Sequence, residues 1–294
     1  MNPDLQFIES LVTRGGPTQM DYPALNDWFS SVHQRVRQGD YPESDLLALR
    51  AAFGDAMSPA TLQGFVCAQP HGYPGDFEII DKIYVRHLSP KPHLLKWDAY
   101  FHAQPATKAV RNRKDYFHTL LDAHSRRRKP LRVLKLASGP GRSMFEWLSA
   151  NRNADVDFTC IELDANAIAY ASALNQDFLA RIAFQQQNAL WIRPNQEYDL
   201  IWAAGLFDYF ADNVFQSVVR RVMPSIAAGG ELVIGNFASS NPSRAYMEFG
   251  GWALHHRSAE ALTSLALSCG AAPHAIRIGA EPEGVNLFLH IAAQ

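Results

Sequence analysis

The sequence has few cysteines and no apolar run long enough to cross a membrane. Its 294 residues include only three cysteines, Cys67, Cys160 and Cys269, which lie far apart in apolar surroundings. This spacing excludes a disulfide or zinc framework and is typical of reduced core residues. No apolar run approaches the roughly 18 residues that a membrane-spanning helix needs, and no signal peptide opens the chain. We therefore expect a cytoplasmic protein with no membrane partner.

The sequence also lacks an excess of charge of either sign. The formal net charge is −2 and charged residues make up 19% of the chain. Nucleic acids and anionic membranes attract strongly basic proteins, so this balance argues against both as partners and leaves a small molecule. The one basic cluster, residues 126–129, comes just before the first expected strand and is interpreted as a solvated linker.

What the sequence does contain is a strand, a glycine turn and a helix in direct succession, LRVLKLASGPGRSMFEW at residues 131–147. The alternating and adjacent apolar residues at its start predict a short buried parallel strand. Gly139 and Gly141 interrupt the pattern before apolar residues return at helical spacing. Such a turn can present backbone N–H groups and a helix N-terminus to a ligand. An ordinary tight turn is the alternative, because a lone glycine turn is weak evidence.

From residue 131 onward, strands and helices alternate, which predicts an α/β fold with a mostly parallel, seven-stranded sheet and helices on both faces. The expected strands are 131–136, 156–161, 182–186, 198–203, 231–235 and about 275–279 and 285–292, with the last two forming a hairpin. Residues 1–128 show helical spacing of apolar residues, punctuated by proline and glycine. We expect them to form a helical lid, and residues 129–294 to form the ligand-binding domain.

Polar residues follow two neighbouring strands of the expected sheet. Glu162 ends the second strand about 20 residues after Gly141, where an acidic side chain can accept hydrogen bonds from both ribose hydroxyls of a nucleoside. Asn188 and Ala189 follow the third strand. An exposed carboxylate without a ligand is the alternative for Glu162. The turn does not supply the G-x-G-x-x-G pattern that NAD binding would require.

The order of Gly139-Pro140-Gly141, Glu162, Asn188-Ala189 and a late hairpin resembles the class I S-adenosylmethionine-dependent methyltransferases over residues 131–294. The resemblance implies S-adenosylmethionine as cofactor, with no metal. It implies that Glu162 holds the ribose, that Leu163 packs on the adenine and that Asn188 and Ala189 meet the adenine edge. The methionine end would be lined by Ala137, Ser138, Gly139 and Gly141, together with Gly205 after the fourth strand. Lys135 stands where that family often has an acid, and Ala137 replaces its usual first glycine.

A narrower resemblance covers residues 65–294. HGYPGDFEIIDKIY, AVRNRK, AAGLFDYF and NPSRAYMEFGGWALHHR are similar to motifs of one bacterial subfamily with a helical N-terminal lid. That subfamily includes small-molecule and fatty-acid-type methyltransferases. It also includes azetidine-2-carboxylate synthases, which cyclise S-adenosylmethionine and release methylthioadenosine. Gly250-Gly251 is a departure, since the resemblance implies an acid before Trp252.

Three functions follow from these resemblances. Cyclisation of S-adenosylmethionine is slightly favoured, because an α-amine that lacks a carboxylate partner loses its proton more easily. The alternatives are methyl transfer to a small acid, amine or hydroxyl compound of secondary metabolism and, of another class, a noncatalytic S-adenosylmethionine-binding regulator. The candidate catalytic residues that would hold or take the proton are Tyr73 and Asp76 in the lid and Asp208 and Tyr209 after the fourth strand. Helix capping by the two aspartates and packing of the two tyrosines are equally compatible with the sequence.

Overall fold

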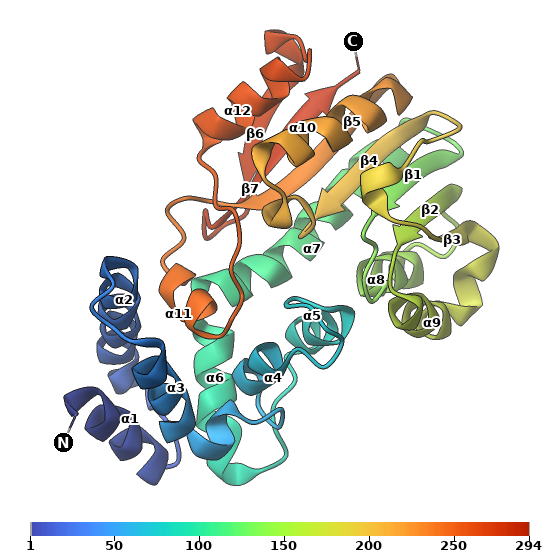
Figure 1. The fold of residues 1–294 in the computed structure, drawn as a ribbon. Helices are drawn as coiled ribbons and strands as arrows, with labels where there is room; N and C mark the ends of the chain where they lie inside the picture. The colour runs from blue at the N-terminus through green and yellow to red at the C-terminus, as the bar shows by residue number, and fades with distance from the viewer. Residues whose placement is uncertain (1, 294) are drawn as a thin grey trace. The chain divides into compact units, whose positions relative to one another are not determined.

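The computed structural model describes residues 2–293 (Figure 1), and the chain divides into two compact units. The helical unit comprises Met1–Lys108 and Pro242–Ala253, and the sheet unit comprises Ala109–Asn241 and Leu254–Gln294. We expected one boundary, at residue 128. The division instead falls within helix α7 (Pro105–Ser125), whose Phe117 and Leu121 are buried in the core of the sheet unit. Each helix within residues 2–293 falls short of the length or the apolar character that spanning a membrane requires.

The sheet unit contains a seven-stranded sheet in the order β3-β2-β1-β4-β5-β7-β6. Strands β1 to β5 are parallel, and β7 pairs antiparallel with both β5 and β6. The α/β fold class and the late hairpin are therefore confirmed. The strands are β1 Leu131–Leu136, β2 Val156–Glu162, β3 Ile182–Gln186, β4 Tyr198–Ala204, β5 Ile226–Phe237, β6 Ile276–Ala280 and β7 Asn286–Ala292.

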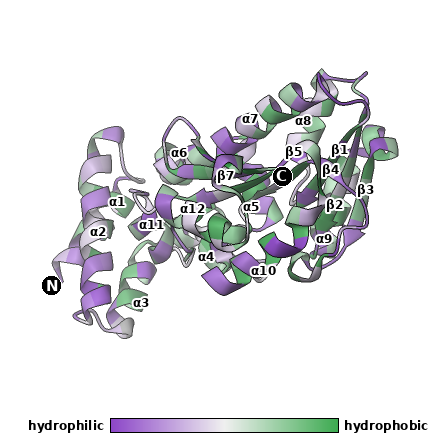
Figure 2. Ribbon diagram, turned by 90° about the horizontal axis from the view of Figure 1, so that it is seen from above, coloured by the Kyte–Doolittle hydropathy of each residue, from purple (hydrophilic) through white to green (hydrophobic). Residues whose placement is uncertain are grey.

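Helices cover both faces of this sheet. One face packs against α10 and α12 through an apolar cluster that includes Val218 and Leu262, and the other packs against α7 and α8 through Phe117 and Met144. The strands between these layers are largely hydrophobic (Figure 2), as burial on both faces requires. The remaining helices of the unit are α8 Arg142–Ala150, α9 Ala165–Leu174, α10 Asp212–Val222 and α12 Ala259–Ser268, with 3-10 turns η4 Gln176–Arg181, η5 Ala189–Trp191, η6 Phe207–Tyr209, η7 Met223–Ser225 and η8 Pro273–Ala275.

The helical unit is built around a cluster of aromatic rings. Phe29 on α2 packs edge-on against Tyr246 and Phe249 of α11, with ring centroids 4.9 and 5.1 Å apart. The Tyr246 hydroxyl donates a hydrogen bond to Gln63, and Arg50 donates to the Phe249 carbonyl. The unit contains α1 Pro3–Thr13, α2 Tyr22–Gln38, α3 Glu43–Ala52, α4 Leu62–Ala68, α5 Phe77–Tyr84, α6 Leu95–Ala103 and α11 Arg244–Phe249, with 3-10 turns η1 Gln19–Asp21, η2 Gly54–Met57 and η3 Pro92–Leu94.

The tract NPSRAYMEFGGWALHHR is thus largely explained by packing. Its central helix, α11, completes the aromatic core of the helical unit, although the preceding helix of that unit, α6, ends at Ala103 and α11 begins only at Arg244. Gly250 and Gly251 lie where α11 ends, with Gly250 as its C-terminal cap.

Candidate functional site

The turn between β1 and α8 has an unusual backbone. Ala137, Gly139 and Gly141 all have positive φ, at +50°, +60° and +73°. For a residue with a Cβ this conformation costs energy, and such strain gathers at functional sites. A Cβ on Gly139 would meet nothing within 4 Å, so this side of the turn is open. A Cβ on Gly141 would lie 2.7 Å from Nδ2 of Asn175, so Gly141 instead allows close packing against α9.

The buried side chain of Lys135 stabilises this turn. Its buried ammonium group donates hydrogen bonds to the Ser138 carbonyl at 3.0 Å and to the Ser143 hydroxyl at 2.9 Å. Burial lowers the pKa of Lys135 to about 8, to which the charge of Arg113 contributes, although Cys160 and Glu162 act in the opposite direction. His118 on α7 contacts the Ser143 carbonyl through Nε2 at 2.8 Å. Lys135 therefore points towards the turn and fixes its shape.

Glu162 at the end of β2 is buried and faces the same turn. One carboxylate oxygen, Oε2, accepts a hydrogen bond from the Gly139 N–H at 2.8 Å. The other, Oε1, accepts from the Leu163 N–H at 2.8 Å and the Asp164 N–H at 3.2 Å. Since a carboxylate offers about four acceptor positions, Oε2 keeps one for a further donor. The alternative of an exposed carboxylate at Glu162 is wrong, because only 8% of the residue is exposed.

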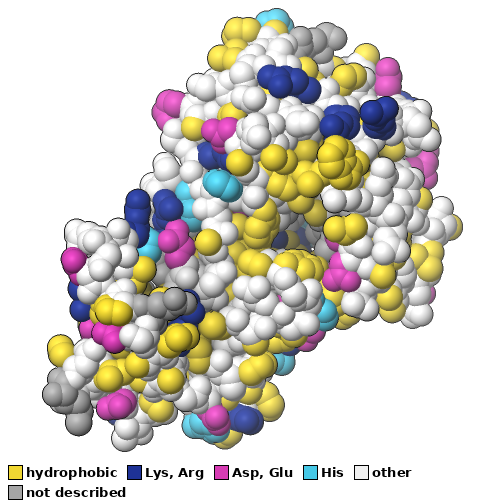
Figure 3. All heavy atoms as spheres, in the orientation of Figure 1, with side chains coloured by type: hydrophobic (Ala, Val, Ile, Leu, Met, Phe, Trp, Pro, Cys, Tyr) yellow, Lys and Arg dark blue, Asp and Glu magenta, His cyan; other side chains and the backbone are white. Residues whose placement is uncertain are grey.

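The residues after β2 and β3 form a partly apolar rim. The Gln187 N–H donates to the Glu162 carbonyl at 2.9 Å, which brings the end of β3 beside the end of β2. Asn188 caps η5 by accepting from the Leu190 N–H, and Ala189 is buried behind it. Leu163 is 59% exposed and Trp191 is 69% exposed, which is unusual for large apolar side chains. Figure 3 shows such hydrophobic surface on the visible face of the sheet unit.

The loop after β4 carries a buried carboxylate. Asp208 is fully buried, and its Oδ1 accepts a hydrogen bond from the Phe237 N–H at 2.6 Å. Its Oδ2 has no hydrogen-bond partner among the described residues. Burial raises the pKa of Asp208 to about 6 in spite of this hydrogen bond and the charges of Arg113 and Arg257. Asp208 does not cap helix α10, whose N-cap is Ala211.

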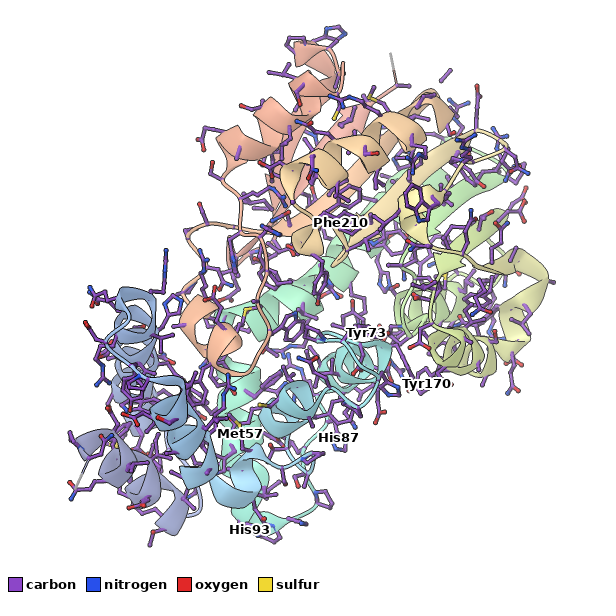
Figure 4. The ribbon with its side chains drawn as sticks, in the orientation of Figure 1. Met57, Tyr73, His87, His93, Tyr170 and Phe210 are labelled. Carbon is purple, nitrogen blue, oxygen red and sulfur yellow. The ribbon has the colours of Figure 1, made fainter. Side chains whose placement is uncertain are left out.

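Arg257 fixes the loop that holds Asp208. Its guanidinium donates to the carbonyls of Phe207 and Phe210 and pairs with Asp212 at 2.8 Å. Phe210, labelled in Figure 4, follows directly after η6 at the end of this loop. Tyr209 lies between Asp208 and Phe210 and is 37% exposed. The loop therefore has a fixed buried carboxylate and a partly exposed tyrosine.

Comparison with known proteins identifies the architecture of the sheet unit. Residues 133–230 match the family model described as a methyltransferase domain. The structure of a possible exported protein from Bordetella parapertussis is similar over 98% of this chain and 95% of its own, at 16% identity and a TM-score of 0.67. The methyltransferase SibL, an S-adenosylmethionine-dependent enzyme solved in its apo form, matches over 89% of this chain and 77% of its own, at 12% identity and a TM-score of 0.52.

Magnesium protoporphyrin IX methyltransferase from Synechocystis PCC 6803, solved with bound S-adenosylhomocysteine, matches over 64% of this chain and 87% of its own, at 12% identity and a TM-score of 0.50. No curated protein matches the sequence. The strand order and the matched domain indicate the same fold. The sheet unit has the class I methyltransferase fold.

In this methyltransferase fold, β1 pairs with both β2 and β4, so the turn after β1, Glu162 at the end of β2 and Gly205 after β4 lie at the ends of adjacent strands. Ligands of such sheets bind at this edge, where the strand order reverses between β1 and β4. Within the described residues, no group of three or more His, Cys, Asp and Glu side chains is arranged to hold a metal ion.

The two candidate catalytic residues of the N-terminal segment belong to the helical unit. Asp76 is the N-cap of α5, where its side chain accepts from the N–H groups of Glu78 and Ile79. Burial raises the pKa of Asp76, against these hydrogen bonds and the charge of His71. Tyr73, labelled in Figure 4, lies before this helix and is 36% exposed. The capping role of Asp76 is confirmed, and a catalytic role for either residue stays a prediction.

Sequence reasoning missed Arg113. This residue is buried on α7, and a Cβ on Gly205 would lie 2.6 Å from its Nη1. The sequence identifies AVRNRK only through the narrower resemblance, because nothing in the sequence shows that a helix preceding β1 reaches the end of β4. A buried arginine beside a glycine with positive φ is the signal that only the structure supplies.

Proposed function

We propose that the sheet unit binds S-adenosylmethionine and that the protein is an S-adenosylmethionine-dependent enzyme acting on a small molecule. The observation that carries the proposal is the strained turn after β1, whose Gly139 N–H is held by the Glu162 carboxylate. A second support is the methyltransferase domain match, together with a relative of the same fold that was solved with S-adenosylhomocysteine. The proposal involves no metal, nucleic acid or membrane, and we keep the cytoplasm as the predicted location.

Each part of the cofactor has proposed partners. Glu162 accepts from the ribose through the free position on Oε2, and exposed Leu163 packs on the adenine, whose edge meets Asn188 and Ala189. The methionine end lies against the turn of Ala137, Ser138 and Gly139, which is open at Gly139, and against Gly205. Gly141 contributes indirectly, through the packing of the turn against α9.

For the reaction, we propose methyl transfer to a small acid, amine or hydroxyl compound. The acceptor attacks the methyl carbon of the sulfonium, the bond between that carbon and the sulfur breaks, and the neutral thioether leaves as S-adenosylhomocysteine. Asp208 and Tyr209, and Tyr73 and Asp76 from the helical unit, are the proposed residues for holding or taking the proton of the acceptor. Asp208 suits this role because its pKa is about 6. At neutral pH the side chain is mostly ionised, and it accepts a proton more readily than an ordinary aspartate does.

Cyclisation of S-adenosylmethionine to azetidine-2-carboxylate is a second candidate, and Lys135 favours it. An acid at this position on β1 would hold the α-amine of the cofactor as an ammonium ion. This chain instead has Lys135, a cation that is hydrogen-bonded to the turn. In cyclisation, the neutral amine nitrogen bonds to the γ-carbon, the carbon–sulfur bond breaks, and methylthioadenosine leaves. The ring nitrogen then releases its extra proton to a base, for which Asp208 is the buried candidate.

Calorimetry on a Glu162→Ala variant tests the cofactor site. We expect S-adenosylmethionine affinity to fall by about 10- to 100-fold, corresponding to about 1.5–3 kcal/mol for hydrogen bonds to a charged group. Asp157→Asn is the matched control, because Asp157 is an exposed acid on the same strand. Unchanged affinity in Glu162→Ala would remove Glu162 from the ribose role.

Incubation of the protein with S-adenosylmethionine separates the reactions. S-adenosylhomocysteine that forms only with an added small acid, amine or hydroxyl compound supports methyl transfer. Methylthioadenosine together with azetidine-2-carboxylate, formed without an acceptor, supports cyclisation, and its rate should rise with pH as the α-amine deprotonates. Tight binding without turnover across the acceptor panel would contradict both and favour a noncatalytic regulator.

A further inference from the structure

Two buried oxygen atoms near the end of β5 have no hydrogen-bond partner among residues 2–293. They are Oδ2 of Asp208, in the loop after β4, and Oδ1 of Asn286, the first residue of β7. Asp208 is fully buried and Asn286 is 1% exposed. A buried acceptor without a donor lowers the stability of a protein, so two such atoms close to one strand end need an explanation.

Both residues lie beside Phe237, the last residue of β5. The Phe237 N–H donates to Oδ1 of Asp208 at 2.6 Å, and Asn286 pairs with Phe237 in the antiparallel ladder between β5 and β7. Gly235 leaves room for the Asn286 side chain, because a Cβ on Gly235 would lie 3.1 Å from its Nδ2. The two oxygens therefore flank the carboxyl end of β5, on the edge of the sheet at which ligands of α/β folds bind.

Hydrogen bonds to the backbone fix the orientation of both side chains. Nδ2 of Asn286 donates to the Leu287 carbonyl at 3.0 Å, so turning the amide over would set its oxygen against another oxygen. Asp208 is held through its other oxygen by the Phe237 N–H. Neither side chain can turn to find a donor without losing the hydrogen bond that it already makes.

The buried carboxylate of Glu281, in the turn between β6 and β7, shows what a carboxylate with a purely structural role looks like. Its two oxygens accept hydrogen bonds from the side chain of Asn112 and from the N–H groups of Glu283, Val285 and Asn286. Oδ2 of Asp208 accepts none from the part of the chain that the structure describes. Asp208 therefore keeps a position for a donor that is not part of this protein.

The chemistry of the two oxygens restricts what that donor is. An amide oxygen only accepts hydrogen bonds, and Asp208, with a pKa of about 6, is mostly ionised at neutral pH and then also only accepts. A group that satisfies both oxygens must bring two N–H or O–H bonds. An amine does so, and so do two neighbouring hydroxyl groups, whereas a carboxylate brings none.

We propose that Oδ2 of Asp208 and Oδ1 of Asn286 together bind the methyl acceptor, and that the acceptor is an amine or a compound with neighbouring hydroxyl groups and not a carboxylic acid. This inference rests on the proposed function and narrows its substrate class. A lone pair of the acceptor nitrogen or oxygen forms the bond to the methyl carbon, and the carbon–sulfur bond of the sulfonium breaks. The proton that the acceptor loses passes to Asp208, while Asn286 orients the acceptor and takes no proton.

The test compares three small probes of one shape by NMR saturation transfer, on protein saturated with S-adenosylhomocysteine. Acetamide brings two N–H bonds, acetone is a neutral molecule of the same shape without them, and acetate carries the charge of a small acid. The proteins are the wild type, Asp208→Asn, Asn286→Leu and the control Asp157→Asn. Asp157 is an exposed acid on β2, so this control makes the same chemical change away from the site.

The wild type should bind acetamide at least about fivefold more tightly than acetone or acetate. In Asp208→Asn the Phe237 N–H still requires the amide oxygen, so an NH₂ group takes the place of Oδ2. The preference for acetamide over acetone should then fall below about twofold, and Asn286→Leu should reduce it in the same way. Asp208→Asn decides the question if thermal melting shows that Asn286→Leu does not fold. Asp157→Asn should behave as the wild type.

Four results would overturn the inference, and they separate its failure from that of the proposed function. If the wild type binds acetamide and acetone equally, an ordered water satisfies the two oxygens, and the inference fails while the proposed function stands. The same holds if the preference survives Asp208→Asn. It also holds if S-adenosylhomocysteine forms from S-adenosylmethionine with carboxylic acids and not with amines or diols. If calorimetry detects binding of neither S-adenosylmethionine nor S-adenosylhomocysteine, the proposed function fails and this inference fails with it.

Discussion

Replacing Lys135 with methionine should change how the stability of the protein depends on pH. Burial lowers the pKa of Lys135 from 10.5 to about 8, which corresponds to about 3 kcal/mol. Between these values the unfolded chain binds more protons than the folded one. The free energy of unfolding therefore rises with pH over this interval, and Lys135→Met lacks this rise. Relative to the variant, the wild type should gain about 3 kcal/mol between pH 7 and pH 10.5.

Urea unfolding of both proteins at several pH values measures this gain. The difference between the two curves is the informative quantity, because titrating groups that both proteins share and that do not interact with Lys135 cancel. Lys135→Met also leaves the Ser138 carbonyl and the Ser143 hydroxyl without their donor, a cost that is nearly the same at every pH. If the difference in unfolding free energy stayed constant within about 0.5 kcal/mol from pH 7 to pH 10.5, Lys135 would not be a desolvated cation beneath the turn.

Four further substitutions test the site and its support. Ala137→Gly should raise the free energy of unfolding by up to about 1 kcal/mol in urea, since relief of positive-φ strain outweighs the added chain entropy; a loss of stability would contradict the strain. Gly139→Ala and Gly141→Ala add similar backbone strain, but only Gly141→Ala forces a Cβ against α9. Gly141→Ala should therefore have a free energy of unfolding about 1–3 kcal/mol lower than that of Gly139→Ala, while Gly139→Ala should mainly weaken S-adenosylmethionine binding in calorimetry. Equal free energies of unfolding for the two variants would contradict this expectation. Burial alone would raise the pKa of Glu231, but hydrogen bonds from His124 and His290 lower it from 4.5 to about 2. Glu231 therefore contributes about 2–3 kcal/mol above pH 4.5, which is lost as the pH falls towards 2, and Glu231→Gln should abolish this acid-dependent part of the urea titration.

The sequence predicted the parts of the fold that local patterns determine. Strands β1, β2 and β4, for example, are short and mostly apolar segments bounded by turn residues, and their positions follow from that pattern. Strand β5 was expected to begin at residue 231 but begins at Ile226, since Gly229-Gly230 is typical of a turn and here lies within the strand. Pairing with a neighbouring strand decides such a case, and one sequence does not contain that information.

The candidate site was predictable where a residue follows a strand directly. Glu162 and the turn after β1 were found in this way, and the structure brings them within hydrogen-bond distance. Arg113 was missed because only the structure shows that α7 brings it beside Gly205 at the end of β4. For a related reason, helical spacing in the sequence does not reveal that Phe117 on α7 packs on the sheet. Both properties arise from contacts between segments far apart in the sequence.

The return of the chain to the helical unit at Pro242–Ala253 has a consequence for synthesis on the ribosome. The N-terminal helices emerge first, but Tyr246 and Phe249, against which Phe29 packs, emerge after most of the sheet. Until then, the nascent helices keep an apolar face unfilled, a state in which chaperones are commonly recruited. The first helices to be made are thus among the last to acquire their complete core, and a chain that stopped before residue 242 would leave both of its units unfinished.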